Sequence, residues 1–369
     1  MITTRRTLMA GALAATAMPT LARDAASADA ALDAVFADHA PVALGAAVIG
    51  RDGVAWSGVR GVRQAGSGDP VSIRDRWHLG SNTKAMTAAL YARLVEQGRA
   101  RWDAPLNELF PDLVIDAGWA NCTVETFLHH RAGLSDATAM GMPWLMTARA
   151  DPRSMPEQRT ALAAAFLKAP PAGTPGDFAY ANGNYVIVGA AIERITGGSW
   201  EDAMTAEVFT PLGMSSAGFG PPRTNADGGP NAWAHTGEGA ARRAVEPGPA
   251  ADNPAALGPA GTVRATLEDY ARFLRVFMTE GGGWLTPASV ARLSTPVETP
   301  PPAYGGGWIV LPTRPWAAGR PLVHEGSNTM WHVVAAVAPA AGKAVVTVVN
   351  EGLANPAPGA LMERLVATL

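Results

Sequence analysis

The sequence predicts an α/β chain of the α+β type: one antiparallel sheet built from both chain termini and flanked by helices, with an inserted, mainly helical lobe. Three observations carry this prediction. Short apolar segments of strand length lie near both ends of the chain. The segments between them are longer and have helical spacing. Finally, 369 residues with 48% hydrophobic content are enough for a large core.

The first part of the chain predicts a helix, a hairpin and a second helix. Residues 29–39 have the pattern of a short helix. Residues 42–50 and 54–60 read as apolar strands, and the Arg-Asp-Gly between them is a hairpin signal. Residues 83–98 predict a helix that ends at its glycine.

The middle of the chain is predicted to be helical. Helical patterns recur over residues 124–134, 156–169, 182–197 and 199–214. Glycine and proline dominate residues 217–261, which predicts loops. A further helix over 266–278 has Thr266 as its expected N-cap.

The last part of the chain returns to strands. Its segments are short, β-rich and separated by turns, which indicates an antiparallel sheet; they are 306–310, 321–326, 330–339 and 343–350, followed by a closing helix over 356–369. The predicted division is a sheet lobe over 23–80 and 262–369, and a helical lobe over 81–261. We expect an active site between the two lobes.

Residues 1–22 predict a cleavable export signal. Arg5 and Arg6 precede an apolar stretch that ends at Met18, and small residues surround Ala22. The arginine pair indicates the twin-arginine route, so the expected location is periplasmic or secreted. The alternative is a membrane anchor, but the stretch is well short of the ~20 residues that span a bilayer. We therefore expect no stable membrane insertion after cleavage.

Composition excludes several classes of partner. The net charge of -3 and the lack of basic tracts argue against a nucleic-acid partner. The single cysteine, Cys122, rules out an intramolecular disulfide. No phosphate-binding loop and no zinc-type histidine motif occurs, and the adjacent His129 and His130 are expected to be structural. No cofactor is implied.

Ser81 and Lys84 form a Ser-x-x-Lys pair at the start of a predicted helix. Positions three apart share one helix face, so the amine would project beside the hydroxyl. A serine nucleophile needs a base, and burial lowers the pKa of a lysine towards that use. Alone, the spacing leaves a helix cap as the alternative role of Ser81. Tyr180, which can move a proton, and Asn182, which can donate to a substrate carbonyl, precede another helix.

A third stretch lies on a predicted strand near the end of the chain. It contains His324 and Gly326, and the glycine would let a substrate backbone approach the strand closely. The backbone N–H groups of Ser327 and Ser81 together could form an oxyanion hole.

These three stretches resemble the penicillin-recognising serine hydrolases, which include class C β-lactamases, D-Ala-D-Ala carboxypeptidases and family VIII esterases. The resemblance covers roughly residues 30–369 and implies a class C β-lactamase-like fold. It rests on "RWHLGSNTKAM", "YANGNYVIVGAAIERITG" and "HEGSNTMW", whose order and spacing agree with the family.

The resemblance also implies roles for individual residues. Ser81 would be the acylated nucleophile and Lys84 its activating partner. Tyr180 would act as general base and later as the acid for the leaving group. Asn182 would orient the acyl chain, and His324 would replace the lysine of the family's Lys-Thr-Gly strand motif.

That strand motif departs from the family, because His-Glu-Gly stands in place of Lys-Thr-Gly. His324 is expected to be only partly cationic at neutral pH, and Glu325 adds negative charge if it points into the site. Both changes disfavour anionic β-lactams and favour neutral esters or amides, or substrates with a free amine. Whether Glu325 points into the site or away along the strand stays open. Among the tryptophans, Trp308 is the best candidate for the wall of an acyl pocket, since it follows three glycines beside this strand.

The sequence thus predicts a serine hydrolase that forms an acyl-enzyme at Ser81 with a small-molecule ester, amide or peptide substrate. The alternatives are a D-amino-acid peptidase, a weak β-lactamase, or a non-catalytic relative that binds ligands through the same cleft. The joint presence of Ser81, Lys84, Tyr180 and Asn182 favours an enzyme.

Overall fold

The computed structural model describes residues 17–369, with side chains described from residue 24 onwards. Most of the predicted export signal over residues 1–22 lies outside the described residues. Helix α1 spans Ala17–His39, so it begins well before residue 29, where the sequence predicts its start. The alanine-rich segment before residue 29 has high helix propensity, which explains the longer helix. Among the described residues, no helix combines the length and apolar character needed to cross a bilayer.

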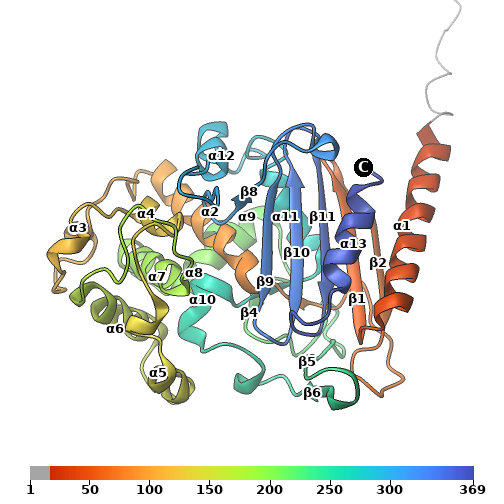
Figure 1. The fold of residues 1–369 in the computed structure, drawn as a ribbon, viewed down its shortest axis with the longest axis horizontal. Helices are drawn as coiled ribbons and strands as arrows, with labels where there is room; N and C mark the ends of the chain where they lie inside the picture. Colours follow the sequence, from red (N-terminus) through yellow and green to blue (C-terminus); the bar gives the residue numbers. More distant parts are fainter. Residues whose placement is uncertain (1–16) are drawn as a thin grey trace, which may run out of the picture.

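Six antiparallel strands form the main sheet in the order β2-β1-β11-β10-β9-β8 (Figure 1). They are β1 (Ala43–Gly50), β2 (Gly53–Gly61), β8 (Ile309–Val310), β9 (Leu322–Ser327), β10 (His332–Ala338) and β11 (Lys343–Val349). Leu44 on β1 lies opposite Val349 on β11, so the start of the chain pairs with its end. The predicted sheet built from both termini is confirmed.

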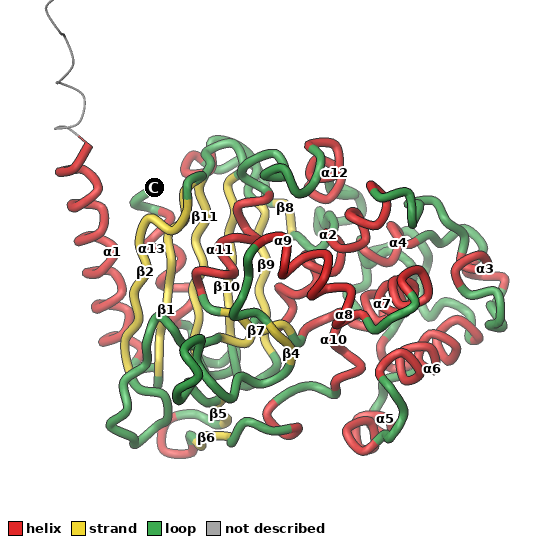
Figure 2. The backbone as a smooth tube through the Cα atoms, turned by 180° about the vertical axis from the view of Figure 1, so that it is seen from behind, coloured by secondary structure: helices red, strands yellow, loops and turns green. Residues whose placement is uncertain are grey.

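Helices cover both faces of this sheet (Figure 1, Figure 2). Helices α1 and α13 (Ala357–Val366) lie on one face, and α11 (Leu267–Val276) lies on the other. On β11, Val345 packs towards α1 and α13, whereas Val346 faces the opposite core. Because this central strand is buried on both faces, its sequence is a continuous apolar run rather than an alternating one.

Helices also build the part of the molecule beside the sheet edge. They are α2 (Thr83–Glu96), α3 (Leu106–Leu109), α4 (Val124–Leu128), α5 (Met142–Thr147), α6 (Met155–Lys168), α7 (Asn182–Thr196), α8 (Trp200–Met204), α9 (Thr210–Leu212), α10 (Gly258–Gly261) and α12 (Pro287–Ser294). The single helix predicted over 199–214 is divided, because a π-helical turn at Thr205–Phe209 separates α8 from α9. Pro211 supplies no amide hydrogen just beyond that turn, which weakens the regular ladder there.

Two small sheets complete the fold. One contains β3 (Trp77–His78), β4 (Gly218–Phe219) and β7 (Val263–Ala265), and the other contains β5 (Ala234–Thr236) and β6 (Arg243–Val245). Strand β3 leads into a short 3-10 turn at Gly80–Asn82, which packs against β9. This contact joins the start of α2 to the large sheet.

Candidate active site

Ser81 lies in the 3-10 turn that runs directly into α2. Its Oγ is 2.9 Å from the Nζ of Lys84, one helical turn further on. The helix begins with Asn82 as the cap residue, which makes no side-chain capping bond. Ser81 therefore contacts the lysine rather than capping the helix, and the alternative role considered from the sequence is not the one observed.

Lys84 is fully buried, and loss of solvent disfavours its charged form. Besides Ser81 Oγ, Nζ contacts Asn182 Oδ1 at 2.9 Å and Ala260 O at 2.8 Å. These two oxygens can only accept, so they take the two hydrogens of a neutral amine. The lone pair is then left for the Ser81 hydroxyl. Desolvation lowers the pKa of Lys84 from 10.5 to about 7, although the charge of Asp136 acts in the opposite direction.

Tyr180 lies just before α7 and covers Lys84, whose Nζ is 4.9 Å from the centre of the tyrosine ring. Desolvation raises the pKa of Tyr180, and a hydrogen bond with the Ser81 hydroxyl opposes that rise. Because 45% of Tyr180 is exposed, water at the surface moderates the effect compared with the fully enclosed Tyr185. The phenol is therefore protonated at neutral pH and lies beside the Ser81 hydroxyl.

Asp136 is a site residue that the sequence did not reveal. Its carboxylate accepts hydrogen bonds from the backbone N–H groups of Asn182 and Gly183 at 3.0 and 2.8 Å, at the start of α7. It also accepts from Asn182 Nδ2 at 3.2 Å, which turns Asn182 Oδ1 towards Lys84. One Nδ2 hydrogen of Asn182 remains for a substrate carbonyl. Asp136 is 46 residues from Asn182 in the sequence, so no local pattern could have indicated this contact.

His324 is not the partly cationic substrate ligand that the sequence suggested. Its ring is 3% exposed, and desolvation together with the charge of Lys84 lowers its pKa to about 3. Nδ1 donates to the carbonyl of Glu325 at 2.8 Å, so Nε2 accepts from the Tyr304 hydroxyl at 2.9 Å. Both ring nitrogens are used within the protein, and His324 carries no charge at neutral pH.

Gly326 is needed for a contact within the protein. A Cβ at this position would lie 2.2 Å from Leu79 O and 2.9 Å from Ser81 N. In the same way, a Cβ on Gly80 would lie 2.4 Å from Ser327 N, and Gly80 has a φ of +51°. The turn that carries Ser81 thus presses directly on β9, where the sequence reasoning expected a substrate backbone. This contact brings the amides of Ser81 and Ser327 together.

Replacing Gly326 by alanine is expected to lower the free energy of unfolding by about 1–3 kcal/mol, the usual cost of overpacking. The added methyl group would collide with Leu79 O and force the Ser81 turn away from β9. Urea unfolding followed by circular dichroism measures this loss. Gly359→Ala is the matched control, because a Cβ on Gly359 meets nothing within 4 Å on helix α13. Equal stability of the two variants would contradict the described contact.

Glu325 lies on the opposite side of β9 from His324 and Gly326, because side chains alternate along a strand. Its side chain is 58% exposed and accepts from His332 Nε2 at 2.5 Å. This hydrogen bond lowers the pKa of Glu325, so the carboxylate is ionised at neutral pH. The question left open by the sequence is thereby answered: the side chain points away from Lys84, but it places an exposed negative charge one residue from the contact between β9 and the Ser81 turn.

Trp308 does not line a pocket, and the prediction that it forms an acyl-pocket wall is wrong. It is fully buried, and its ring packs at 5.3 Å against that of Phe277 in the main core. The glycines before it pack behind α2: a Cβ on Gly307 would lie 2.4 Å from Ala85 N. The glycine run therefore turns the chain into the core rather than towards solvent.

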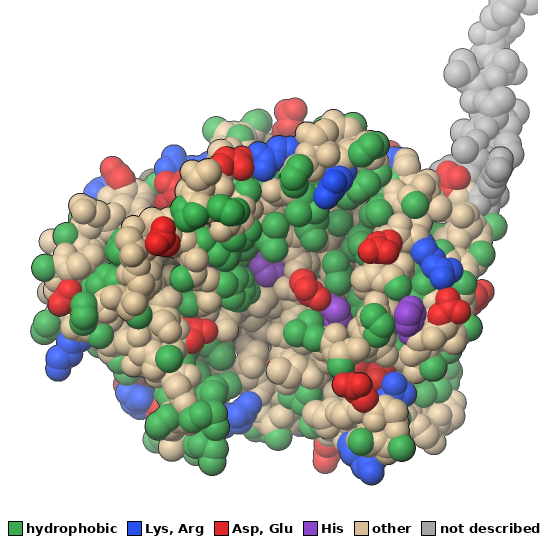
Figure 3. Space-filling view, viewed as in Figure 1, with side chains coloured by type: hydrophobic (Ala, Val, Ile, Leu, Met, Phe, Trp, Pro, Cys, Tyr) green, Lys and Arg blue, Asp and Glu red, His purple; other side chains and the backbone are tan. Residues whose placement is uncertain are grey.

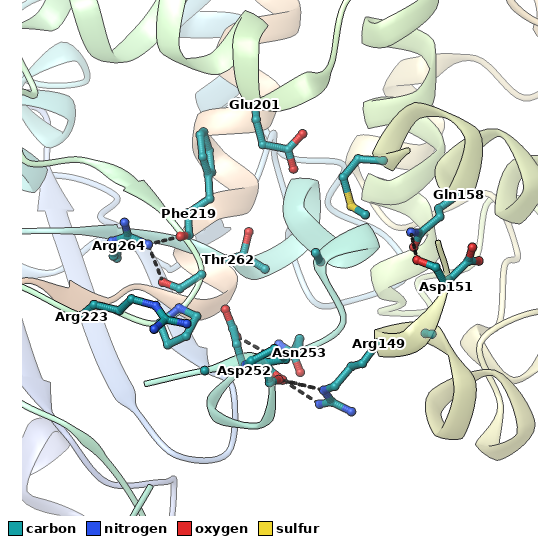
Figure 4. A pocket seen from close by; sticks show the side chains of 17 residues that line it. Arg149, Asp151, Gln158, Glu201, Phe219, Arg223, Asp252, Asn253, Thr262 and Arg264 are labelled. Atoms are coloured by element: carbon teal, nitrogen blue, oxygen red, sulfur yellow. Dashed lines mark hydrogen bonds between the residues drawn. The ribbon is translucent and has the colours of Figure 1, made fainter. Parts of the chain in front are cut away.

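The surface is hollowed between the helical part and the sheet, and hydrophobic side chains gather along one wall of this hollow (Figure 3). A cavity of about 510 Å³ lies elsewhere, between the loops after β4 and the starts of α6 and α8 (Figure 4). Its lining residues include Arg149, Asp252 and Arg264 but none of Ser81, Lys84 and Tyr180. The candidate active site is therefore the cluster around Ser81, and this cavity is separate from it.

The sequence matches the family model described as β-lactamase over residues 28–367. The chain belongs to the β-lactamase family. Ser-x-x-Lys is a signature of β-lactamases, and this chain carries it at Ser81 and Lys84.

Two curated relatives and one solved structure illustrate what this chain is similar to. The chain is 28% identical to the unguisins hydrolase ungD' of Aspergillus campestris over 290 residues. The matched region covers 74% of this chain and 52% of that protein. The chain is 30% identical to the esterase EstB of Burkholderia gladioli over 210 residues, and this matched region covers 53% of each protein. The chain thus spans about half the length of these two curated relatives. The octameric penicillin-binding protein homologue from Pyrococcus abyssi has the same fold, with a TM-score of 0.76 at 21% identity over 93% of this chain and 76% of that one.

Proposed function

We propose that this β-lactamase-family protein hydrolyses small neutral esters or amides through an acyl-enzyme on Ser81. The observation that carries the proposal is the set of three contacts around Lys84 Nζ, which leave the lone pair of a neutral amine directed at Ser81 Oγ. With a pKa of about 7, a large fraction of Lys84 is in this neutral form at physiological pH.

In the first step, Ser81 Oγ attacks the substrate carbonyl carbon and its proton passes to Lys84 Nζ. The resemblance to the family implied Tyr180 as the general base. The structure favours Lys84 in that role, because the raised pKa of Tyr180 keeps the phenol protonated. Negative charge develops on the carbonyl oxygen, where the amides of Ser81 and Ser327 can donate to it.

In the second step, the tetrahedral intermediate collapses and the leaving group departs with a proton from Tyr180. Tyr180 is then a phenolate and Lys84 an ammonium, and transfer of the Lys84 proton to the phenolate returns both groups to their neutral forms. Water subsequently attacks the acyl-Ser81 ester and releases the acid. Asn182, held by Asp136, donates its free Nδ2 hydrogen to the acyl chain.

The charges around the site favour neutral substrates. His324 is uncharged, so no cation replaces the family's strand lysine, and Glu325 adds an exposed negative charge nearby. We expect short-chain p-nitrophenyl esters to be hydrolysed faster than nitrocefin, which carries a carboxylate. Steady-state kcat/KM values for both substrates measure this ranking, and efficient nitrocefin hydrolysis with inert esters would contradict it.

The substitution Glu325→Gln tests the electrostatic reason for this ranking. It removes one negative charge and is expected to raise kcat/KM for nitrocefin about two- to fivefold relative to the ester, a size typical of a solvent-screened charge. Glu298→Gln is the matched control, because Glu298 is 54% exposed, close to the 58% of Glu325, and pairs with Arg320. An unchanged ratio in Glu325→Gln would show that this carboxylate does not act on the substrate.

A fluorophosphonate probe separates the hydrolase from a non-catalytic binding relative. The probe forms a stable bond to an activated serine, so the wild type is expected to be labelled and Ser81→Ala is not. Lack of labelling in both proteins would favour the binding role. Labelling of Ser81→Ala would place the nucleophile elsewhere.

A further inference from the structure

A buried carboxylate connects the two backbone segments that meet at the candidate oxyanion hole. Asp252 follows a short 3-10 turn at Pro249–Ala251 and is 3% exposed. One of its oxygens contacts His78, and the other contacts Asn328. His78 lies three residues before Ser81, and Asn328 directly follows Ser327. None of these three residues touches the reacting groups described above.

The link through His78 has a fixed hydrogen-bond direction. The N–H of Gly80 can only donate, so His78 Nδ1 accepts it at 3.2 Å. The proton of the neutral ring is then on Nε2, which donates to Asp252 Oδ2 at 2.9 Å. His78 is fully buried on β3, and water does not compete for these bonds. Asp252 therefore orients the imidazole that holds the peptide before Ser81.

The link through Asn328 fixes the other segment. Asn328 Nδ2 donates to Asp252 Oδ1 at 3.0 Å and to Ala251 O at 3.2 Å. Its Oδ1 accepts from the backbone N–H groups of Met330 and Trp331, both at 3.1 Å. All the hydrogen-bonding ends of this amide are thus engaged, and the turn that follows Ser327 is held in one geometry.

Asp252 is itself held in place from both sides. Arg149 Nη2 donates to the Asp252 carbonyl at 2.6 Å, from the wall of the cavity shown in Figure 4. The N–H of Asn253 donates to Asp252 Oδ1 at 2.7 Å. The direct contact between Gly80 and Ser327 is backbone against backbone.

We propose that Asp252 is a positioning residue, which acts through His78 and Asn328 to hold the Ser81 and Ser327 amides at the separation that an oxyanion requires. The catalytic consequence rests on the proposed hydrolase function, whereas the structural link does not. A misplacement of about 1 Å in such a site costs on the order of 10²-fold in rate. The amides act on the transition state, so the loss is expected in kcat rather than in KM.

Two substitutions break the link at different points. Asp252→Asn keeps the shape of the side chain but replaces one carboxylate oxygen by an NH2 group. That group must face a second donor, either His78 Nε2 or Asn328 Nδ2, so one of the two hydrogen bonds is lost. His78→Asn retains an oxygen that can accept from the Gly80 N–H and loses the reach to Asp252. The matched control is Glu193→Gln, because Glu193 is also buried and joins two segments through Arg159 and the Trp200 N–H, neither of which belongs to the oxyanion hole.

Each of the two variants is expected to lower kcat for p-nitrophenyl butyrate about 10²-fold, with KM within about threefold of the wild type. The double variant is expected to be no slower than the slower single one, because both changes interrupt one chain of contacts. Glu193→Gln is expected to lose stability while keeping kcat. A kcat within about threefold of the wild type in Asp252→Asn, or an equal loss in Glu193→Gln, would overturn the proposal.

Amide hydrogen exchange gives a readout that does not need catalysis. In Asp252→Asn we expect faster exchange in peptides that cover residues 78–82 and 326–330, and in Glu193→Gln no change in either peptide. If the wild type proved inactive while Asp252→Asn still exchanged faster in these peptides, the hydrolase function would be refuted and the link supported. Unchanged exchange in both peptides would refute the link itself, whatever the activity.

Discussion

Replacement of Lys84 by alanine is expected to slow ester hydrolysis by at least ~10²-fold, the scale of a lost general base. The amine is the group that contacts Ser81 Oγ while its other two neighbours are pure acceptors. Without it, the Ser81 proton has no acceptor with a pKa near neutrality, because the phenol of Tyr180 stays protonated. Both kcat/KM for p-nitrophenyl butyrate and the rate of fluorophosphonate labelling are expected to fall together.

The control for this substitution is Lys168→Ala, which removes an exposed lysine from the last turn of α6. It is expected to retain wild-type rates. Lys84→Ala with labelling and hydrolysis rates close to the wild type would exclude the amine as the base. A thermal unfolding curve shows whether any loss comes from misfolding.

Replacement of Tyr180 by phenylalanine is also expected to cost at least ~10²-fold in kcat, since it removes the proton donor for the leaving group. The ring remains, and with it the cover over Lys84, 4.9 Å from the ring centre. The loss is therefore expected to be larger for substrates with a basic leaving group, such as alkyl esters or amides, than for p-nitrophenyl esters. A series of esters with alcohols of increasing pKa measures how the loss in kcat depends on the basicity of the leaving group.

Tyr91→Phe is the matched control for Tyr180→Phe. Its hydroxyl donates to the Arg101 carbonyl at 2.6 Å, so the substitution removes a part-buried hydrogen bond away from Ser81 and Lys84. We expect reduced stability with unchanged kcat. If Tyr180→Phe showed the same loss for all leaving groups, the phenol would not be the acid.

The residues that converge at the site could be predicted where the chemistry has a local pattern. Ser81 and Lys84 are one helical turn apart at a helix start, and this spacing alone brings the amine to the hydroxyl. The strands could likewise be predicted from short apolar runs between turns, including the hairpin near the start of the chain. Tyr180 and Asn182 are candidates by their chemistry, and their specific roles come from the resemblance to a family.

Long-range contacts and burial could not be predicted from the sequence. The contact of Asp136 with Asn182 and that of Asp252 with His78 join residues 46 and 174 positions apart, which no local spacing encodes. The neutral state of His324 depends on its complete burial beside Lys84. The prediction that Trp308 lines a pocket is wrong for a related reason. Three glycines indicate a tight turn, but they do not indicate whether the next side chain faces a pocket or the core.

The pH dependence of Ser81 reactivity tests the account most directly. An uncharged fluorophosphonate brings no titrating group of its own. Desolvation lowers the pKa of His324 to about 3, so this residue stays neutral at the pH values tested. Because only the neutral amine of Lys84 can take the proton, the labelling rate is expected to rise with pH, to reach half its maximum at about 7, and then to level off. A half-maximum near 10.5, the ordinary pKa of lysine, or a rate independent of pH from about 5 to 9, would contradict Lys84 as the base that activates Ser81.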